Sequence, residues 1–345
     1  MKRLVTVIVV IAVLGFGTSR GLDWWNYNLN TPPSTTSQQV IFHVDRGELA
    51  SQIGDDLYTQ RLIRDRNAFD LYVRITNAAA KFEAGTFLLN RNMSLTQIVD
   101  KLQHGTADQV LVTIREGFPL KFQAQDVEKS GLGSAADYLS AAKDPAVAAS
   151  YPFLASRPSS ADPPLEGYLF PDTYEIDRTG GMTQLVKKQL DQFGTVFSPA
   201  LRDQITQATA ARPAESVEAI VILASMVERE ANKDADRGNV CSVYYNRLKA
   251  GMPLGVDATL LYALGRLTPE PTYPELQLNT PFNTRTHAGL PPGPIGNPGK
   301  AALLACINPP STSYLYYFTD PDGVTHFETN QNDFCRELQQ HGMSC

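Results

Sequence analysis

A nearly continuous apolar run at residues 219–227, ending at Glu228, constrains the fold of this chain more than any other feature. The first six residues of the run are all apolar. A helix built from them is apolar on every side and therefore has to be buried. Glu228 extends the helical stripe of Val217, Val221 and Ala224, so its carboxylate should also face protein. Burial favours the neutral form of a carboxyl group, which general acid catalysis near neutral pH requires.

Two other properties of this helix end bear on that interpretation. Glu228 could simply form an ion pair with Arg229 or Arg237 near the surface. Glu230 follows two residues later, about 200° around the helix, so the two glutamates cannot easily face one site. We therefore expect a helix over residues 214–231, with Glu228 as the candidate acid and Glu230 as a structural ion-pair partner.

Length and composition fit an ordinary globular protein. At 345 residues the chain has room for about two domains, and 43% of its residues are hydrophobic against 19% charged. A net charge of −6 gives no support to nucleic-acid binding. The sequence holds no P-loop or dinucleotide-binding fingerprint, and its five histidines are scattered without an H-x-x-x-H pair. We expect neither a metal site nor a cofactor.

The N-terminus differs from the rest of the chain. Two basic residues precede an almost wholly apolar stretch at residues 4–17. This pattern fits a signal peptide, and it also fits a short membrane anchor, with Trp24 and Trp25 at the far interface. We expect residues 1–20 to be an anchor, which would make the chain a single-pass plasma-membrane protein with its bulk on the extracytoplasmic side. The sequence leaves open whether the segment is cleaved.

Export would permit disulfide bonds among the four cysteines, Cys241, Cys306, Cys335 and Cys345. Cys335 and Cys345 are near enough in sequence to form a local staple for the C-terminal tail. The spacing does not fix the connectivity, and all four could equally be free thiols.

Behind the N-terminal segment, the pattern predicts a linker and a small α/β module. Residues 21–39 are polar and read as a flexible spacer. In residues 40–108 short strands and helices alternate. Within this module, Ser94 and Gln97 form a capping-box pattern ahead of an apolar helix face. The expected elements are strands at 40–44 and 82–89 and helices at 49–63, 68–76 and 94–102.

Residues 109–345 predict a second, larger domain of mixed helices and strands, which makes the fold class α+β. A Pro-Asp-Gly turn should join a hairpin that contains His326. Residues 253–310 are dense in Pro, Gly, Asn and Thr and should be mostly loop, as in a functional cleft. The other expected elements are strands at 110–114, 314–319 and 325–328 and helices at 182–193, 199–210 and 238–250.

Several segments of this second domain, in order along the chain, resemble the endolytic murein transglycosylase (YceG-like) family. One is Leu223-Ala-Ser-Met-Val-Glu-Arg-Glu-Ala231, around the end of the apolar helix. Another is Gly289-Leu-Pro-Pro-Gly-Pro-Ile-Gly-Asn-Pro-Gly299, in the loop-rich region. The other matching segments are Glu166–Tyr174, Val243–Leu254, Asp257–Thr259, Phe282–Thr284 and Tyr314–Phe318. The N-terminal half resembles the family more loosely, and residues 40–108 correspond to its LysM-like module.

The resemblance implies an enzyme that cuts nascent peptidoglycan strands internally and so terminates their elongation. Glu228 matches the family's catalytic glutamate. Such an acid protonates the oxygen between N-acetylmuramic acid and N-acetylglucosamine, and then accepts the proton of the muramic C6 hydroxyl as a 1,6-anhydro ring closes. No second carboxylate and no water is needed, unlike in ordinary glycosidases. The implied partners are glycan strands, the plasma membrane and peptidoglycan synthases.

Further residues are candidates for substrate contact. Asp257 and Asn283 could hydrogen-bond N-acetyl groups or sugar hydroxyls, although Asp257 could equally cap the helix that follows it. Glu166 and Tyr168 could line the glycan cleft, yet Tyr168 alternates with other aromatic residues as a core-facing residue would. Asn246, on the helix after the apolar one, is a further candidate.

Two other functions stay open. A hydrolase acting on the same bond would need a water and a second carboxylate, for which Asp257 or Glu166 are the available partners. A non-catalytic protein could instead bind cell-wall glycans through the LysM-like module. The products of glycan digestion distinguish these functions, because a lytic enzyme leaves anhydro ends, a hydrolase leaves reducing ends and a binding protein leaves the strands intact.

Overall fold

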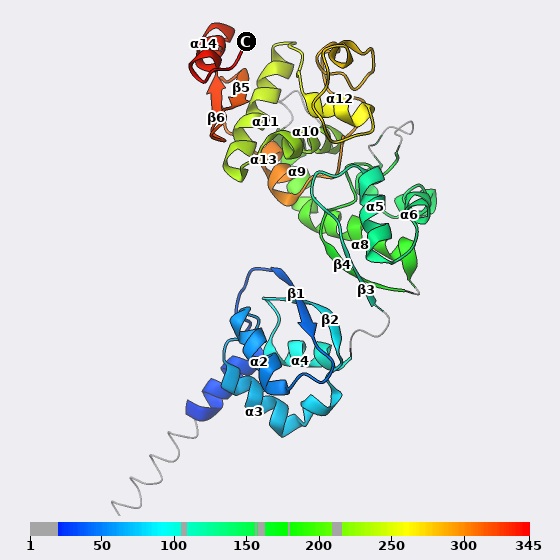
Figure 1. Ribbon diagram of the computed structural model, residues 1–345, viewed down its shortest axis with the longest axis vertical. Helices are drawn as coiled ribbons and strands as arrows, with labels where there is room; N and C mark the ends of the chain where they lie inside the picture. The colour runs from blue at the N-terminus through cyan, green and yellow to red at the C-terminus, as the bar shows by residue number, and fades with distance from the viewer. Residues whose placement is uncertain (1–19, 105–108, 156, 158–162, 179, 209–215) are drawn as a thin grey trace, which may run out of the picture. The chain divides into compact units, whose positions relative to one another are not determined.

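The structure is a computed structural model that describes residues 20–104, 109–155, 157, 163–178, 180–208 and 216–345 (Figure 1). It divides into two compact units, the first ending at Leu111 and the second beginning at Val112. Both contain helices and strands, which confirms the predicted α+β class.

The first unit pairs two antiparallel strands, β1 (Gln39–Val44) and β2 (Gly85–Asn90), so that Phe42 lies opposite Phe87. Both of these rings are buried, whereas Ile41, pointing to the other face, is 51% exposed. This alternation is what a strand with one core-facing side produces. The connecting helices are α2 (Ala50–Thr59), α3 (Arg66–Thr76), the short 3-10 helix η1 (Ala78–Lys81) and α4 (Leu95–Gln103).

Helix α4 begins at the predicted capping box. The Ser94 hydroxyl accepts a hydrogen bond from the Gln97 backbone N–H at 3.3 Å, and the Gln97 side chain accepts one from the Ser94 N–H at 2.8 Å. Two backbone donors that the first helical turn leaves without intrahelical partners are thereby satisfied. The predicted apolar face is buried in the core of this unit, namely Leu95, Ile98, Val99 and Leu102.

Residues 20–30, most of them within the stretch read as a polar spacer, are helical. Leu29 of this helix is 7% exposed and belongs to the core of the first unit. Trp25 packs against the same core and lies 6.3 Å from the Tyr72 ring, centroid to centroid. A tryptophan that was assigned to a membrane interface therefore contacts protein.

The predicted single-pass plasma-membrane localisation has to be corrected. In the part of the chain that the structure describes, no helix is long and apolar enough to cross a membrane. A span requires about 20 apolar residues, and the longest helices in that part of the chain, α8 (Gly181–Val196) and α11 (Asp234–Lys249), have 16 residues each. The predicted anchor itself, residues 1–20, lies outside the described residues except for Arg20.

The second unit begins within strand β3 (Gln109–Thr113), which pairs with β4 (Thr173–Asp177). Helix α8 packs on β4 and on α6 (Ala135–Ala141), and α6 packs on α5 (Leu120–Ser130). The remaining elements of the second unit before residue 209 are α7 (Pro145–Ala148), the 3-10 helix η2 (Pro152–Leu154) and α9 (Pro199–Ala208).

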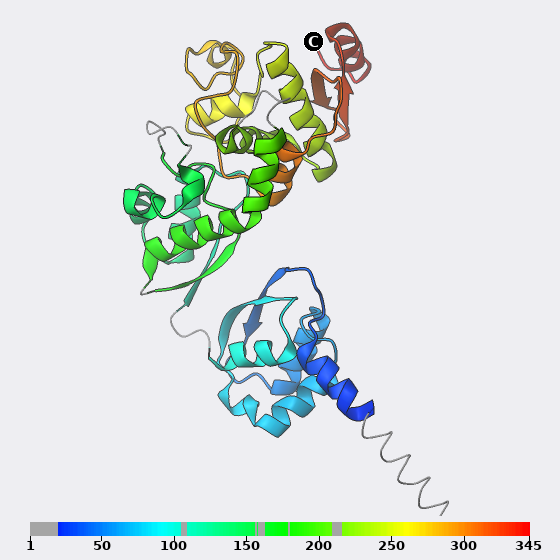
Figure 2. The same ribbon diagram turned by 180° about the vertical axis from the view of Figure 1, so that it is seen from behind.

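Helix α10 (Val217–Glu230) is the apolar helix that the sequence predicts, and residues 219–227 are all buried. It starts at Ser216, whose hydroxyl accepts a hydrogen bond from the Ala219 N–H at 3.1 Å. Helices α10, α11 and α13 (Lys300–Ile307) contact one another in pairs and form the centre of the part of the second unit that follows residue 215, as both views show (Figures 1 and 2). These two neighbouring helices account for much of the apolar surface of α10.

The loop-rich region and the C-terminal hairpin follow the prediction with additions. Residues 253–310 are mostly irregular but also form α12 (Asp257–Ala263), the 3-10 helix η4 (Glu275–Gln277) and α13. Strands β5 (Tyr316–Thr319) and β6 (Thr325–Glu328) form the expected antiparallel hairpin. Helix α14 (Gln331–Gln340) packs on both strands.

Two disulfide bonds settle the cysteine pairing that the sequence left open. Cys335–Cys345 is the local staple expected from the spacing, and it ties α14 to the end of the chain. Cys241–Cys306 joins α11 to α13 across a Cα separation of 5.5 Å. This second bond crosslinks two helices that both pack on α10.

Candidate functional site

Glu228, in the last turn of α10, is held in a buried ion pair. Its side chain is 5% exposed, and its Oε1 lies 2.8 Å from Nη2 of Arg237, whose own side chain is 10% exposed. Its Oε2 accepts a hydrogen bond from the backbone N–H of Gly299 at 2.9 Å. The ion pair with Arg237, named above as the alternative for Glu228, is therefore present. Whether Glu228 also takes part in catalysis stays a prediction.

A second carboxylate, Glu116, lies beside Glu228. Burial raises the pKa of Glu116, and the negative charge of Glu228 raises it further. Two glycines make this close packing possible. A Cβ on Gly299 would lie 2.2 Å from Glu116 Oε1, and one on Gly117, whose φ is +72°, would lie 3.0 Å from Cγ of Glu228. A side chain at either position would displace the carboxylates, so the cluster depends on bare backbone.

Glu230 faces a different part of the unit. Its Oε2 accepts a hydrogen bond from the Tyr317 hydroxyl of β5 at 2.9 Å, and it also accepts one from the backbone of Ala258 in α12. Burial raises the pKa of Glu230, and the charges of Asp257 and Glu270 raise it further. The predicted role as an ion-pair partner has no support here, because no cation among the described residues forms a salt bridge with Glu230 within 4 Å.

A cavity of about 610 Å³ lies at Glu230. It contains acidic, basic and aromatic side chains, which together give it both charge and flat apolar surface. Its lining residues are Arg229, Glu230, Asn232, Arg247, Leu254, Gly255, Asp257, Glu270, Arg285, Tyr316, Tyr317, Phe318, Thr319 and Phe334. Of the two glutamates at the end of α10, only Glu230 is among them.

Asp257 lies in this cavity, alone among the predicted substrate-contact residues. It is the first residue of α12 and not its N-cap, a position that Val256 occupies. Its carboxylate pairs instead with Arg285, which also lines the cavity. The capping alternative is therefore absent, and the position of Asp257 is compatible with substrate contact.

Glu166 and Tyr168 are buried in the scaffold of the second unit. Glu166 is 3% exposed and accepts hydrogen bonds from the Leu120 N–H at 3.0 Å and from the Asn297 side chain at 2.8 Å. Tyr168 is fully buried, and its hydroxyl donates to Glu218. These contacts match the core-facing alternative given for Tyr168, and substrate contact by either residue stays a prediction.

Asn246 and Asn283 each bond to backbone carbonyls. Asn246 donates to Thr312 and Tyr314 at 3.0 and 2.9 Å, which fixes the segment leading into β5 against α11. Asn283 is fully buried and donates to Leu276 and Leu278 at 3.0 and 2.8 Å. Both amides hold loops in place, and a role in substrate contact stays a prediction for each.

The buried carboxyl of Glu166 predicts a pH-dependent stability. Burial raises its pKa to about 7, from 4.5. Between pH 4.5 and 7 the unfolded chain releases this proton while the folded chain keeps it, so stability falls as the pH rises. The loss is on the order of 3 kcal/mol and is complete above about pH 7. We expect Glu166→Gln to flatten this slope in urea unfolding followed at pH 5, 6, 7 and 8. An unchanged slope would contradict the prediction.

The sequence does not identify two carboxylates at the end of α10, Glu116 and Glu230, as candidates for the site. Glu116 reaches Glu228 from a strand end more than a hundred residues away, and a sequence carries no periodicity across such a distance. Glu230 was set aside because it faces away from Glu228, but the face it occupies is the one that meets Tyr317. The tyrosine-rich strand predicted at 314–319 was the available signal, since a tyrosine hydroxyl commonly pairs with a buried polar group.

Among the described residues, one group of His, Cys, Asp and Glu side chains is close enough together to hold a metal ion. It comprises Asp320, His326 and His341. None of the three lines the cavity at Glu230. The expectation of no metal site rested on sequence spacing, which does not register these contacts across the hairpin.

Comparisons with known proteins agree on one family. A model of the YceG-like family matches residues 42–340. The endolytic murein transglycosylase of Bacillus subtilis is 30% identical over 300 residues, which cover 84% of this chain and 81% of that protein. The protein of the same name from Streptococcus pneumoniae D39 is 28% identical, and the match covers 98% of this chain but 64% of that protein. This chain therefore spans about two thirds of the streptococcal relative's length.

The architecture agrees with a solved structure. A crystal structure of a yceG-like protein from Listeria monocytogenes superimposes with a TM-score of 0.59 at 30% sequence identity. The superposition covers 88% of this chain and all of the other. Because the family model, two relatives and a solved structure match most of the chain, this protein belongs to the YceG-like family.

Proposed function

We propose that this protein is an endolytic murein transglycosylase, as its relatives from Bacillus subtilis and Streptococcus pneumoniae are named. The observation that carries the proposal is Glu230. It places a carboxyl group of raised pKa in a cavity of about 610 Å³. A raised pKa keeps a larger share of the group protonated near neutral pH, as a general acid requires.

Within this proposal we assign the acid role to Glu230 and a structural role to Glu228. Both oxygens of Glu228 already accept from strong donors, one from a guanidinium and one from a backbone N–H. That side chain is also 5% exposed and does not line the cavity. Glu230 lines the cavity, and a neutral hydroxyl at 2.9 Å orients its carboxyl group.

The reaction needs one carboxyl group used twice. In the first step Glu230 donates its proton to the oxygen between N-acetylmuramic acid and N-acetylglucosamine as that bond breaks. In the second, the same group takes the proton of the C6 hydroxyl while the C6 oxygen bonds to C1 and closes the 1,6-anhydro ring. The nucleophile belongs to the substrate, so neither a water nor a second carboxylate is consumed, in contrast to hydrolysis.

The other lining residues fit a glycan that carries acidic peptides. The rings of Tyr316, Phe318 and Phe334 offer flat apolar surface for sugar faces, and Arg229 and Arg247 offer positive charge. Arg285 pairs with Oδ1 of Asp257, so Oδ2 of the same carboxylate can accept hydrogen bonds from sugar hydroxyls. We further propose that the first unit is a LysM-like module that binds the same strands. The resemblance of residues 40–108 to the family's LysM-like module supports this.

The products of digestion test the proposal. Purified peptidoglycan is incubated with the protein, and the fragments are analysed by mass spectrometry. We expect 1,6-anhydromuramic ends released from within strands. Reducing ends would instead indicate a hydrolase, for which Asp257 is the remaining carboxylate partner, because Glu166 is buried and fully bonded. Strands that are bound but left intact would indicate a glycan-binding protein.

A further inference from the structure

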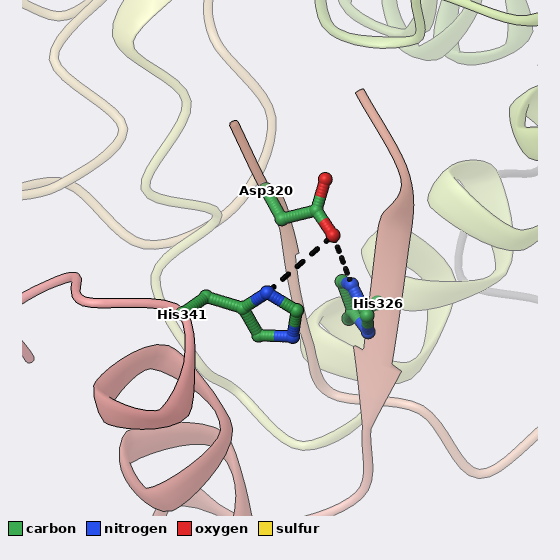
Figure 3. Close-up of side chains that lie close together, drawn as sticks. All are labelled: Asp320, His326 and His341. Atoms are coloured by element: carbon green, nitrogen blue, oxygen red, sulfur yellow. Dashed lines mark hydrogen bonds and ion pairs between the residues drawn. The ribbon is translucent and has the colours of Figure 1, made fainter. Parts of the chain in front are cut away.

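Two histidine rings and one carboxylate converge at the C-terminal hairpin (Figure 3). Asp320 follows β5, His326 lies in β6 and His341 follows α14. The Asp320 Oδ2 lies 2.8 Å from Nε2 of His326 and 3.5 Å from Nδ1 of His341. All three potential ligand atoms lie within 4.8 Å of one another. We propose that these three residues, with a water molecule as the fourth ligand, bind a Zn²⁺ ion that fastens α14 to the hairpin.

The spacing of the three atoms suits a small tetrahedral ion. Zinc binds imidazole nitrogen and carboxylate oxygen at about 2.0–2.2 Å, so neighbouring ligand atoms of a tetrahedron lie about 3.4 Å apart. The separations of 2.8 and 3.5 Å fall on either side of that value. The third separation, between the nitrogens of the two histidines, is at most 4.8 Å, so side-chain rotations that bring the rings together would complete the tetrahedral spacing. Two imidazoles with one carboxylate favour Zn²⁺ over Mg²⁺ or Ca²⁺, which prefer oxygen ligands.

The surroundings already orient these side chains as outer-sphere partners do in zinc sites. The other ring nitrogen of His326, Nδ1, lies 3.5 Å from Oε1 of Glu337 on α14. A carboxylate on the far nitrogen of a metal-bound histidine fixes its tautomer and ring orientation. The second oxygen of Asp320 accepts the Val324 N–H at 2.8 Å, and the Asp320 side chain is 4% exposed.

An apolar wall closes one side of the cluster. The Phe318 ring stacks on His326 with centroids 4.9 Å apart, and Phe334 of α14 meets Phe318 edge-on at 5.8 Å. Phe318 and Phe334 also line the cavity at Glu230. An ion at this position would therefore brace the wall of that cavity that is formed by β5 and α14.

Zinc titration of the full chain tests the site. The protein is prepared without an affinity tag, stripped with a chelator and kept oxidised, so that both disulfides exclude thiol ligands. Calorimetric titration with Zn²⁺ should give one equivalent per chain. The thermal midpoint should rise by about 5 °C or more at a hundredfold excess over Kd. Absence of both effects would overturn the proposal, as would an equal midpoint shift with Mg²⁺.

Matched variants locate the ion. His326→Asn and His341→Asn should each weaken Zn²⁺ binding at least 100-fold, and Glu337→Gln should weaken it 10- to 100-fold. His287→Asn, a change at an exposed histidine outside the cluster, should leave binding unchanged. Near-UV circular dichroism without metal checks that each variant is folded. Unchanged affinity in folded His326→Asn or His341→Asn would contradict the assignment.

A readout on the unaltered protein covers the case in which a variant does not fold. Co²⁺ in a tetrahedral site absorbs strongly in the visible range, whereas six-coordinate Co²⁺ absorbs weakly. The wild-type chain should give the strong bands with one equivalent of Co²⁺ and lose them when Zn²⁺ is added. Weak bands only would overturn the proposed geometry.

Discussion

Glu230→Gln is expected to lower the rate of glycan cleavage by about 10³-fold or more. General acid–base catalysis by one group contributes about 10²–10⁴-fold, and here the same carboxyl group serves in both proton transfers. Glutamine keeps the shape of the side chain and can still accept the Tyr317 hydrogen bond, so strand binding should persist. The measurement is the initial rate of release of anhydro-ended fragments, with binding to insoluble peptidoglycan measured in parallel.

Glu228→Gln is the matched control, because it makes the same change two residues away on the same helix. We expect it to retain cleavage within about tenfold of the wild type per folded molecule, and to lower stability through loss of the charge on a buried ion pair. The reverse pattern would assign catalysis to Glu228, as the family resemblance implies. In that case a folded Glu228→Gln is inactive and Glu230→Gln is active, so the pair of variants decides between the two glutamates whatever the products turn out to be.

Much of the fold could be predicted because its signals are local. The capping box at Ser94 and Gln97, the apolar run of α10 and the Pro-Asp-Gly turn between β5 and β6 each occupy fewer than a dozen neighbouring residues, and all are present in the structure. The helix at residues 20–30 was missed for the opposite reason. Most of it adjoins the polar residues 31–39 and is interpreted with them as a spacer, and only its contact with the core of the first unit, through Leu29, shows otherwise.

The site was harder to predict because α10 is buried on every side. Periodicity identifies a face that points at protein, but on this helix both glutamates point at protein. One meets Arg237 and Gly299, and the other meets Tyr317 and the start of α12. Which of these surroundings is a cavity depends on how the loops from 253 to 310 pack, and no local pattern encodes that. The Asp320, His326 and His341 cluster was missed in the same way, since its members meet only through the hairpin and α14.

Arg237→Met is expected to destabilise the second unit by about 3 kcal/mol, because it leaves the Glu228 carboxylate buried without its opposite charge. The Gly299 N–H still donates to that carboxylate, and Asp234, which also loses its bond to Arg237, is itself 81% exposed to solvent. Urea unfolding can follow each unit separately. Both tryptophans, Trp24 and Trp25, lie in the first unit, so their fluorescence reports on it alone and should not change. The near-UV dichroism of the tyrosines, most of which lie in the second unit, should shift to lower urea.

Combining Arg237→Met with Glu228→Gln separates an unpaired charge from lost packing. If the buried charge is the cause, glutamine at position 228 removes it, and the double variant should be more stable than Arg237→Met alone. If the double variant instead loses as much stability as the two single variants together, the destabilisation by Arg237→Met comes from the loss of the arginine's contacts with its neighbours. A shift of less than about 1 kcal/mol in Arg237→Met would show that the pair is solvated, as surface pairs are. Glu228 would then be free to move, and the structural role proposed for it would fail.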